Sequence, residues 1–154
     1  MNKYPALNLP NNQIRLRDDG YIFDLVRKKW LVLTPEEWVR QHVVNFLNSD
    51  LGYPIGLMQL EKGIRVNGLL KRTDLQVADN SGNPLLLVEC KEPRVSISQQ
   101  VFDQIARYNM TLKVPFLLVS NGLKHYCCHI NIPQNKYTFL KSIPTFVELL
   151  NFKK

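Results

Sequence analysis

The sequence lacks several features that would identify particular classes of protein. It contains no run of about 18 apolar residues that could span a membrane. Its first residues do not follow the basic and then apolar pattern of a secretory signal. The three cysteines, two of them adjacent, form a poor disulfide framework and favour a reducing compartment. We therefore expect a cytoplasmic protein that has no membrane partner.

A second group of absences concerns domain organisation and motor activity. No G-x-x-x-x-G-K-[ST] phosphate loop occurs, so the chain cannot by itself be an ATP-driven motor. Internal repeats, low-complexity tracts and long linkers are also missing. The 154 residues, 45% apolar and 21% charged, therefore predict a single globular domain over residues 1–154.

Charge of one sign predominates in the composition. Twenty Lys and Arg outnumber thirteen Asp and Glu, which gives a formal net charge of +7. A basic surface attracts polyanions, so DNA is a candidate partner.

Hydrophobic periodicity and turn residues predict the order of elements. Alternating residues around an Asp18-Asp19-Gly20 turn predict short strands, which we assign to a β extension over residues 1–33. Thr34 can cap a helix that should run to about residue 48, because proline at 35 and two glutamates suit a helix start. A core over 34–130 and a C-terminal strand and helix over 131–154 complete the division. The other expected elements are a hairpin over 71–91, a helix over 98–112 capped by Ser96 or Ser98, strands over 115–120 and 124–130, and a short helix from about 144.

The hairpin over residues 71–91 is the most informative segment. Turn-forming residues occupy 80–83, and symmetry about Ser81 and Gly82 places Asp74 directly opposite Glu89. Directly opposed Cβ atoms lie about 4.5–5.5 Å apart, where like charges destabilise a sheet unless a cation lies between them. The register thus predicts a cation site.

The motif “VECK” at residues 88–91 adds further groups to this pair. Glu89 and Lys91 share one face of the strand, because side chains alternate along it, and the backbone carbonyl of Cys90 lies between them. Two carboxylates and a carbonyl are oxygen ligands that suit Mg²⁺, for which Mn²⁺ should substitute. Lys91 could orient or deprotonate a water molecule and offset charge on a phosphate. The pattern predicts phosphodiester hydrolysis, whereas the alternative is an ordinary charged strand at a sheet edge.

The same residues resemble a known group of enzymes. “RTD” at 72–74 followed by “VECK” resembles the PD-(D/E)XK nuclease superfamily, with Thr73 in place of the usual proline. Four stretches in order, “TPEEWVRQHVVNFL”, “LVECKEP”, “FDQIARYN” and “FLLVSNG”, are similar to the N-terminal nuclease domain of type I restriction enzyme R subunits, over residues 30–126. This resemblance implies an α/β, restriction-endonuclease-like fold, in which helices flank a central mixed sheet and the acidic pair lies on the middle hairpin.

The resemblance also implies a glutamate from the first helix in the metal site. Glu36 or Glu37 could serve, and the positions of Val39 and Val43 favour Glu36, which borders the apolar face while Glu37 should point well away from it. The alternative is that both glutamates only favour the positive end of the helix.

A Q-x-x-x-Y motif is a second feature that the resemblance implies. Gln104 and Tyr108 match it one helical turn apart and could contact a DNA phosphate or support the lysine. Outside this context the pair would be a half-buried helix face.

Two other features are tempting but weaker. His125, Cys127, Cys128 and His129 suggest zinc, but residues so close together on a strand point to opposite faces. His42 lies on the apolar side of the first helix, so we expect it to be packed or to face DNA.

These observations favour a metal-dependent DNA nuclease with Mg²⁺ as cofactor, acting in restriction, defence or DNA processing. The alternatives are a non-catalytic nucleic-acid-binding module that retains the fold, and a structural or protein-interaction domain. A separate motor or targeting subunit and a second copy of the chain are further expected partners. The residues expected to form the catalytic and metal site are Glu36, Asp74, Glu89, Cys90 through its carbonyl, Lys91, Gln104 and Tyr108.

Overall fold

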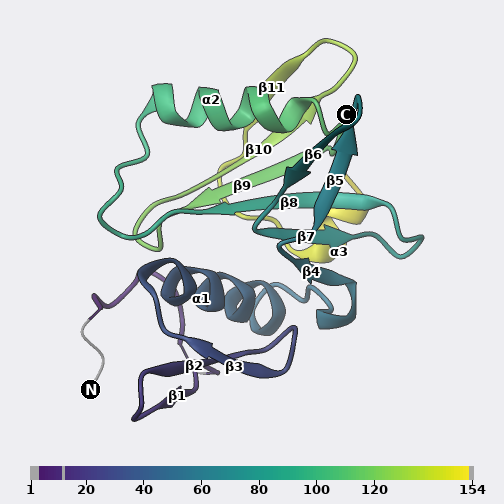
Figure 1. The fold of residues 1–154 in the computed structure, drawn as a ribbon. Coiled ribbons are helices and arrows are strands. Elements are labelled where there is room, and N and C mark those ends of the chain that lie inside the picture. Colours follow the sequence, from purple (N-terminus) through teal and green to yellow (C-terminus); the bar gives the residue numbers. More distant parts are fainter. Residues whose placement is uncertain (1–3, 12, 153–154) are drawn as a thin grey trace.

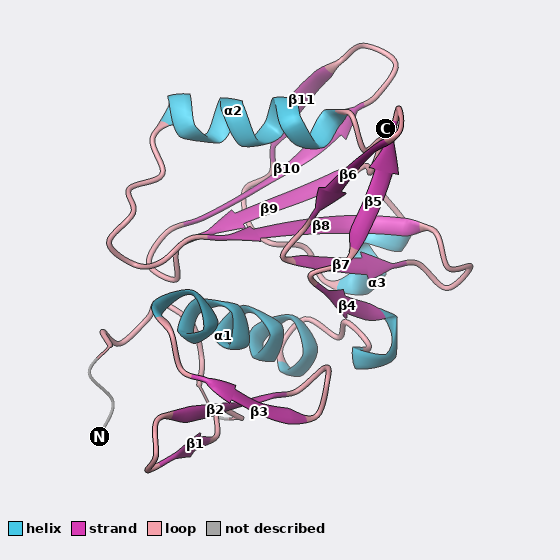
Figure 2. Ribbon diagram, viewed as in Figure 1, coloured by secondary structure: helices cyan, strands magenta, loops and turns pink. Residues whose placement is uncertain are grey.

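A six-stranded mixed sheet forms the centre of the fold (Figures 1 and 2). The computed structural model describes residues 4–11 and 13–152, so part of the predicted extension, residues 1–3 and 12, lies outside the described residues. The strand order is β11-β10-β9-β8-β7-β4, and only the β8–β9 pair is parallel among the described strands of this sheet. A three-stranded meander, β1-β2-β3, and a two-stranded hairpin, β5-β6, form separate sheets.

The described elements follow in chain order. They are β1 (Leu16–Arg17), β2 (Tyr21–Asp24), β3 (Lys29–Val32), α1 (Pro35–Ser49), the 3₁₀ turn η1 (Ile55–Leu57), β4 (Met58–Leu60), β5 (Gly63–Val66), β6 (Leu69–Arg72), β7 (Leu75–Ala78), β8 (Pro84–Cys90), α2 (Gln99–Met110), β9 (Phe116–Ser120), β10 (His125–Asn131), β11 (Lys136–Phe139) and α3 (Phe146–Leu150). None of the described helices is long and apolar enough to cross a membrane.

The predicted α/β class and the central mixed sheet flanked by helices are confirmed. The parallel pair β8–β9 requires a crossover connection, and α2 supplies it. Helix starts agree with the sequence, because Thr34 accepts a hydrogen bond from the Glu37 amide and Ser98 accepts one from the Val101 amide. The choice between Ser96 and Ser98 is thereby settled for Ser98.

The predicted hairpin register is also confirmed. Leu75 pairs with Val88 and Gln76 with Leu87, and the register shifts only near the turn, between Val77 and Ala78. The first predicted strand is wrong in one respect, because the run from residue 71 to 78 is not continuous. β6 ends at Arg72 in the small hairpin, and the chain enters the central sheet at Leu75. Asp74 therefore lies in the bend just before β7.

Two apolar clusters cover the two faces of the central sheet. On one face, Val88 and Cys90 belong to a cluster with Val43 and Leu47 of α1. On the other face, Leu87 belongs to a cluster with Phe102 of α2. Glu89 is two residues after Leu87, so its side chain points to the same face of the sheet, on the α2 side, at the end of β8.

Helix α1 lies between the central sheet and the β1–β3 meander (Figure 1). Every residue from 38 to 45 is buried. Because successive helical residues are about 100° apart, eight consecutive buried residues occupy the whole circumference. Ile22 and Asp24 of β2 are fully buried, and the Leu25 amide donates to Oε1 of Gln41 at 3.3 Å. The meander therefore covers the side of α1 that faces away from the central sheet.

Candidate functional site

Asp74 and Glu89 lie together at the end of the β7–β8 pair, as predicted. The Cys90 amide donates a hydrogen bond to Oδ2 of Asp74 at 2.7 Å, which fixes this carboxylate against the end of β8. Asp74 immediately precedes Leu75 and Glu89 immediately follows Val88, and Leu75 with Val88 is the last β7–β8 pair. The hairpin thus brings two acidic side chains to one point.

The carboxyl of Glu89 has an unusual proton affinity. Burial, the charge of Asp74 and a hydrogen bond to the Asp74 side chain raise the pKa of Glu89 to about 8, although Lys91 acts in the opposite direction. Two neighbouring carboxylates that repel each other in a partly buried place are a common feature of functional sites. The arrangement favours either a proton or a cation between them.

Lys91 follows β8 directly and is half-buried. Its amide donates to the carbonyl of Ser120 at 2.8 Å, which continues the parallel pairing with β9 by one residue. Its charge lowers the pKa of Glu89, so the ammonium group lies within electrostatic reach of the acidic pair. The Cys90 side chain is buried in the α1 cluster, and burial raises the pKa of its thiol well above the ordinary value. This thiol stays protonated at neutral pH, so only its backbone is a candidate ligand.

A surface cleft of about 310 Å³ lies between Glu89 and helix α2. Its lining includes Glu89, Gln104 and Tyr108, together with Arg72 from the end of β6. The two residues of the Q-x-x-x-Y motif therefore face the acidic site. Asn109, which also lines the cleft, is fully buried, and its Oδ1 has no hydrogen-bond partner among the described residues.

The first helix contributes its glutamates differently from the prediction. Glu36 is exposed, and its charge raises the pKa of Glu89, so it lies near the acidic pair. The expectation that Glu37 points well away from the packed side is wrong. Only 12% of its side chain is exposed, and it contacts Arg40 and Arg27. The prediction assumed one packed face, whereas α1 is packed on all sides.

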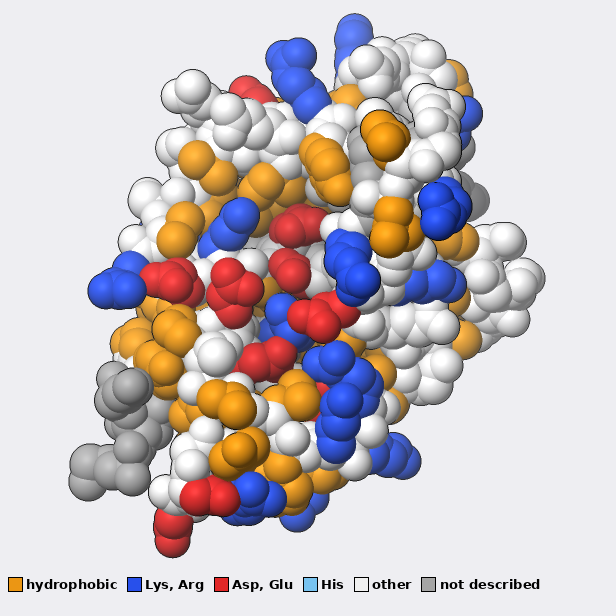
Figure 3. All heavy atoms as spheres, in the orientation of Figure 1, with side chains coloured by type: hydrophobic (Ala, Val, Ile, Leu, Met, Phe, Trp, Pro, Cys, Tyr) orange, Lys and Arg blue, Asp and Glu red, His pale blue; other side chains and the backbone are white. Residues whose placement is uncertain are grey.

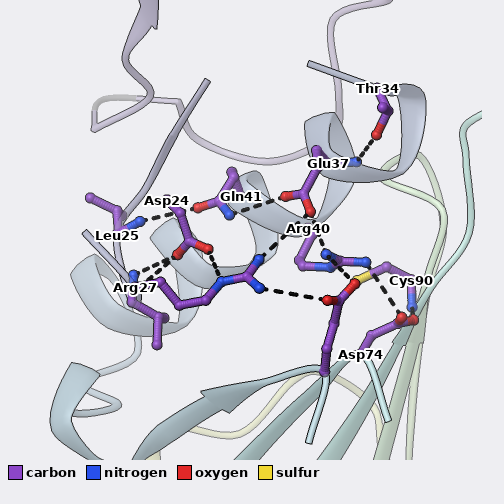
Figure 4. Close-up of polar contacts among 11 residues, drawn as sticks. Asp24, Leu25, Arg27, Thr34, Glu37, Arg40, Gln41, Asp74 and Cys90 are labelled. Carbon is purple, nitrogen blue, oxygen red and sulfur yellow. Dashed lines mark hydrogen bonds and ion pairs between the residues drawn. The ribbon is translucent and has the colours of Figure 1, made fainter. Parts of the chain in front are cut away.

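Arg40 is the residue that sequence reasoning missed. Its side chain is only 5% exposed, and its guanidinium contacts Glu37, Oε1 of Glu61 at 3.4 Å and Oδ1 of Asp74 at 3.5 Å (Figure 4). Burial acts to lower the pKa of Arg40, but the charges of Glu37 and Asp74 outweigh it and raise the pKa above its ordinary value. The spacing of three residues between Glu37 and Arg40 was the available indication.

The network of ion pairs around Arg40 extends to the β1–β3 meander. Arg27 Nε donates to Oδ2 of the fully buried Asp24 at 2.6 Å, and its Nη1 lies 3.5 Å from Oε2 of Glu61. Gln41 Nε2 donates to Oε2 of Glu37 at 3.3 Å. Figure 3 shows the result on one face of the molecule, where acidic side chains gather between the levels of α1 and α2 with Lys and Arg around them.

The remaining candidates prove to be packing residues. Cys127 and Cys128 belong to the clusters on opposite faces of the sheet, as expected for neighbours on a strand, which argues against zinc. His42 is buried, its Nδ1 lies 2.7 Å from the Trp38 carbonyl oxygen, and its ring contacts the Trp38 ring at a centroid distance of 4.3 Å.

The donor set at the acidic pair fits a hard divalent cation. No group of three or more His, Cys, Asp or Glu side chains in metal-binding proximity occurs within residues 4–11 and 13–152. Two carboxylates with a backbone carbonyl and water are nevertheless a common ligand set for Mg²⁺, which keeps several waters. The repulsion that raises the pKa of Glu89 is what such a cation would relieve.

Comparison with known families identifies the chain. The family described as type I restriction enzyme R protein N terminus (HSDR_N) matches residues 35–144. The chain belongs to this family. The match begins at the first residue of α1 and includes both strands of the acidic hairpin, α2 and β9 to β11. The meander precedes the matched HSDR_N region.

A solved structure shares this fold. It is the fragment structure of a putative HsdR subunit of a type I restriction enzyme from Vibrio vulnificus YJ016, with 21% identity and a TM-score of 0.55. The similarity covers 77% of the chain but only 25% of that HsdR fragment. Comparison with curated proteins gave no match.

Arg40→Met should destabilise this HSDR_N-family domain by about 3–5 kcal/mol, because it leaves partly buried carboxylates without their cation. The matched control is Arg94→Met, which removes an ion pair to Glu92 whose arginine is 88% exposed and should cost at most about 1 kcal/mol. Urea unfolding of both variants measures the difference. An equal loss in both would contradict the structural role of Arg40.

The raised pKa of Glu89 predicts a pH-dependent stability without divalent cations. From its ordinary value near 4.5 up to about 8, the folded state holds a proton that the unfolded chain has released, so the free energy of unfolding should fall as pH rises. Glu89→Gln keeps the side-chain shape and should remove a fall on the order of a few kcal/mol between about pH 5 and pH 8. Glu92→Gln is the control. The same pH dependence in the parent and in Glu89→Gln would count against this assignment.

Proposed function

We propose that the chain is a metal-dependent deoxyribonuclease of the PD-(D/E)XK type that acts in DNA restriction or a related process. Membership of the HSDR_N family supports the restriction context. The observation that carries the proposal is the meeting of Asp74 and Glu89, with Lys91 nearby, where Glu89 lines a surface cleft. DNA is the proposed substrate, and other subunits of a type I restriction system are the proposed partners.

Asp74, Glu89 and the backbone carbonyl of Cys90 would hold Mg²⁺, with Glu36 near enough to take part through water. The bound ion would supply Lewis acidity and a more acidic water molecule. The other tasks belong to the chain itself. Hydrogen bonding to the Cys90 amide orients Asp74, and the ion pair with Arg40 holds it from the other side. Lys91 would orient the attacking water and offset the charge that develops on the phosphate.

Gln104 and Tyr108 would hold the DNA backbone across the cleft from the acidic pair. Both are exposed on α2, and both line the cleft with Arg72 and Glu89. Neutral donors next to a carboxylate can bind phosphate oxygens without competing for the cation, and Arg72 adds a positive charge at the edge. The side chains therefore divide into a group for the cation and a group for the phosphate backbone.

A second candidate function is nucleic-acid binding without cleavage. The contact between Arg40 and Asp74 favours it, because Asp74 already has a cationic partner within the protein itself. The two functions differ in metal dependence. A cleavage assay on linear, circular and branched DNA, with and without Mg²⁺, distinguishes them.

Asp74→Asn should weaken Mn²⁺ binding at least about tenfold, because it removes one of two charged ligands while preserving the side-chain shape. Isothermal calorimetry measures the affinity, and DNA cleavage should disappear in parallel. Asp50→Asn is the matched control, since Asp50 is exposed at the C-terminal end of α1. Unchanged Mn²⁺ affinity in Asp74→Asn would remove the basis of the metal site.

Lys91→Ala should lower the cleavage rate about 10²- to 10³-fold, because the lysine acts on the water and on the transition-state charge. Metal affinity should fall only slightly, since the lost positive charge makes Glu89 harder to ionise. Lys124→Ala, at an exposed position, should retain both properties. A large loss of metal affinity in Lys91→Ala would show that the lysine belongs to the ligand shell instead.

A further inference from the structure

The outer face of the β1–β3 meander combines arginines and aromatic rings. Burial alternates along β2, where Ile22 and Asp24 are buried while Tyr21 and Phe23 are not. Strand pairing adds their neighbours, because Arg17 pairs with Tyr21 and Trp30 with Phe23. The Phe23 amide donates to the carbonyl of Arg15 at 3.0 Å, which brings a further arginine alongside. We define the arginine–aromatic face as Arg15, Arg17, Tyr21, Phe23 and Trp30.

Both guanidinium groups of this face lie over aromatic rings. Arg15 Cζ lies 4.5 Å from the ring centroid of Phe23 and 5.4 Å from that of Trp30. Arg17 Cζ lies 4.6 Å from the centroid of Tyr21 and 4.9 Å from that of Trp30. Trp30 therefore contacts both arginines, and its ring meets that of Phe23 edge-on at 5.3 Å.

The positive charge of the face is available to a partner. No carboxylate pairs with Arg15 in the part of the chain that the structure describes. Arg17 forms a bidentate ion pair with Asp19 through two hydrogen bonds of 2.9 Å. Both side chains are exposed, by 42% and 57%, so solvent screens the pair and a phosphate can compete for the guanidinium. Lys28 and Lys29 are exposed at the β2–β3 turn. Arg27, in contrast, turns inward to the buried Asp24 and takes no part in the face.

The arginines and rings of this face are not needed merely to hold the meander in place. Ile22, Asp24 and Leu25 already anchor the strands to α1 from the other side. An arginine held over a ring loses conformational freedom in advance, while its N–H groups remain able to bind phosphate oxygens. Rings beside cations are also the components that bind successive bases and phosphates of single-stranded nucleic acid. The expected partner is therefore a polyanion that also carries flat aromatic rings.

We propose that the arginine–aromatic face binds single-stranded nucleic acid, with Arg15 and Arg17 on phosphates and Trp30 against a base. The net charge of +7 gives the electrostatic complementarity. The β1–β3 meander and the strands β7 and β8 lie on opposite sides of α1 (Figure 1), so the face is a contact separate from the proposed cleavage site. Binding there requires no metal and no catalysis.

The two tryptophans allow a direct test on the full chain. Trp38 is 5% exposed and packed against His42, whereas Trp30 belongs to the proposed face. Titration with a dT oligonucleotide of about 15 nucleotides, without divalent cations, should quench tryptophan fluorescence. The quenching should persist in Trp38→Phe and disappear in Trp30→Phe. Persistence in Trp30→Phe would overturn the assignment.

Charge variants test the face without changing the reporter. Arg15→Gln should weaken binding of a fluorescently labelled dT oligonucleotide at least about threefold at low salt, and should reduce the slope of log affinity against log salt by about 0.7. Lys141→Gln removes the same charge at an exposed position outside the meander and should change neither value appreciably. Equal effects of the two variants would show that binding is diffuse and would overturn the proposal.

Two further experiments identify the class of partner and distinguish binding at this face from the proposed nuclease activity. Poly-glutamate of similar length, which has charge but no rings, should compete at least tenfold less well than the dT oligonucleotide. Equal competition would assign the face to an acidic protein segment instead. Asp74→Asn should keep the parental quenching and affinity, so failure of the cleavage proposal leaves this result unaffected.

Discussion

Burial of one guanidinium group constrains the whole arrangement of the site. Arg40 is 5% exposed at the packed centre of α1, where an uncompensated charge would cost several kcal/mol. Its neutralisation requires carboxylates from three places: Glu37 on the same helix, Glu61 after β4, and Asp74 before β7. Helix α1, the β4–β5 connection and the acidic hairpin must therefore meet at one point. The position of Asp74 is in this sense a consequence of the burial of Arg40, reinforced by the Cys90 amide.

The same constraint includes the meander. Arg27 joins the buried Asp24 to Glu61 and approaches Glu37 at 4.0 Å, so the charges of the extension and of the site form one network. A helix covered by a sheet on each side needs polar partners on what would otherwise be its solvent face. Gln41, fully buried, meets this need by accepting from the Leu25 amide and donating to Glu37. The meander thus acts as a third layer of the fold, and its outer side carries the arginine–aromatic face.

Local patterns predicted much of the fold and part of the site. The predicted register holds from Leu75 to Val77, and it brings Asp74 and Glu89 together as expected. Next to the turn Ala78 pairs with Pro84, one residue out of that register, so the hairpin reaches it through an irregularity that symmetry about the turn does not predict. Helix caps are equally local, and Thr34 and Ser98 cap their helices as expected.

The orientation of Glu37 was not predictable in this way, because it depends on a sheet that packs from a distant part of the chain. The break between β6 and β7 and the partners of Arg40 depend on the same long-range packing. Periodicity specifies which residues are buried, but it does not specify how many layers bury them.

Charge balance within this basic protein leaves its acidic centre with more carboxylates than cationic groups. Within the described residues, the ion pairs of Asp24, Glu37, Glu61 and Asp74 are formed with two arginines, Arg27 and Arg40, so this network holds an excess of carboxylates before Glu89 is counted. Ionisation of Glu89 adds to this excess in a partly buried place, and its pKa is accordingly raised to about 8. Arg72 and Glu89 both line the cleft, so a phosphate diester bound there would lie next to an acidic group as well as a cationic one. Lys91 supplies one charge against this repulsion, which is too little for a carboxylate pair and a phosphate together.

A divalent cation would balance Asp74 and an ionised Glu89, displace the proton and give the phosphate a favourable electrostatic environment. In this arrangement metal binding and phosphate binding would depend on each other, because each would reduce the electrostatic cost of the other.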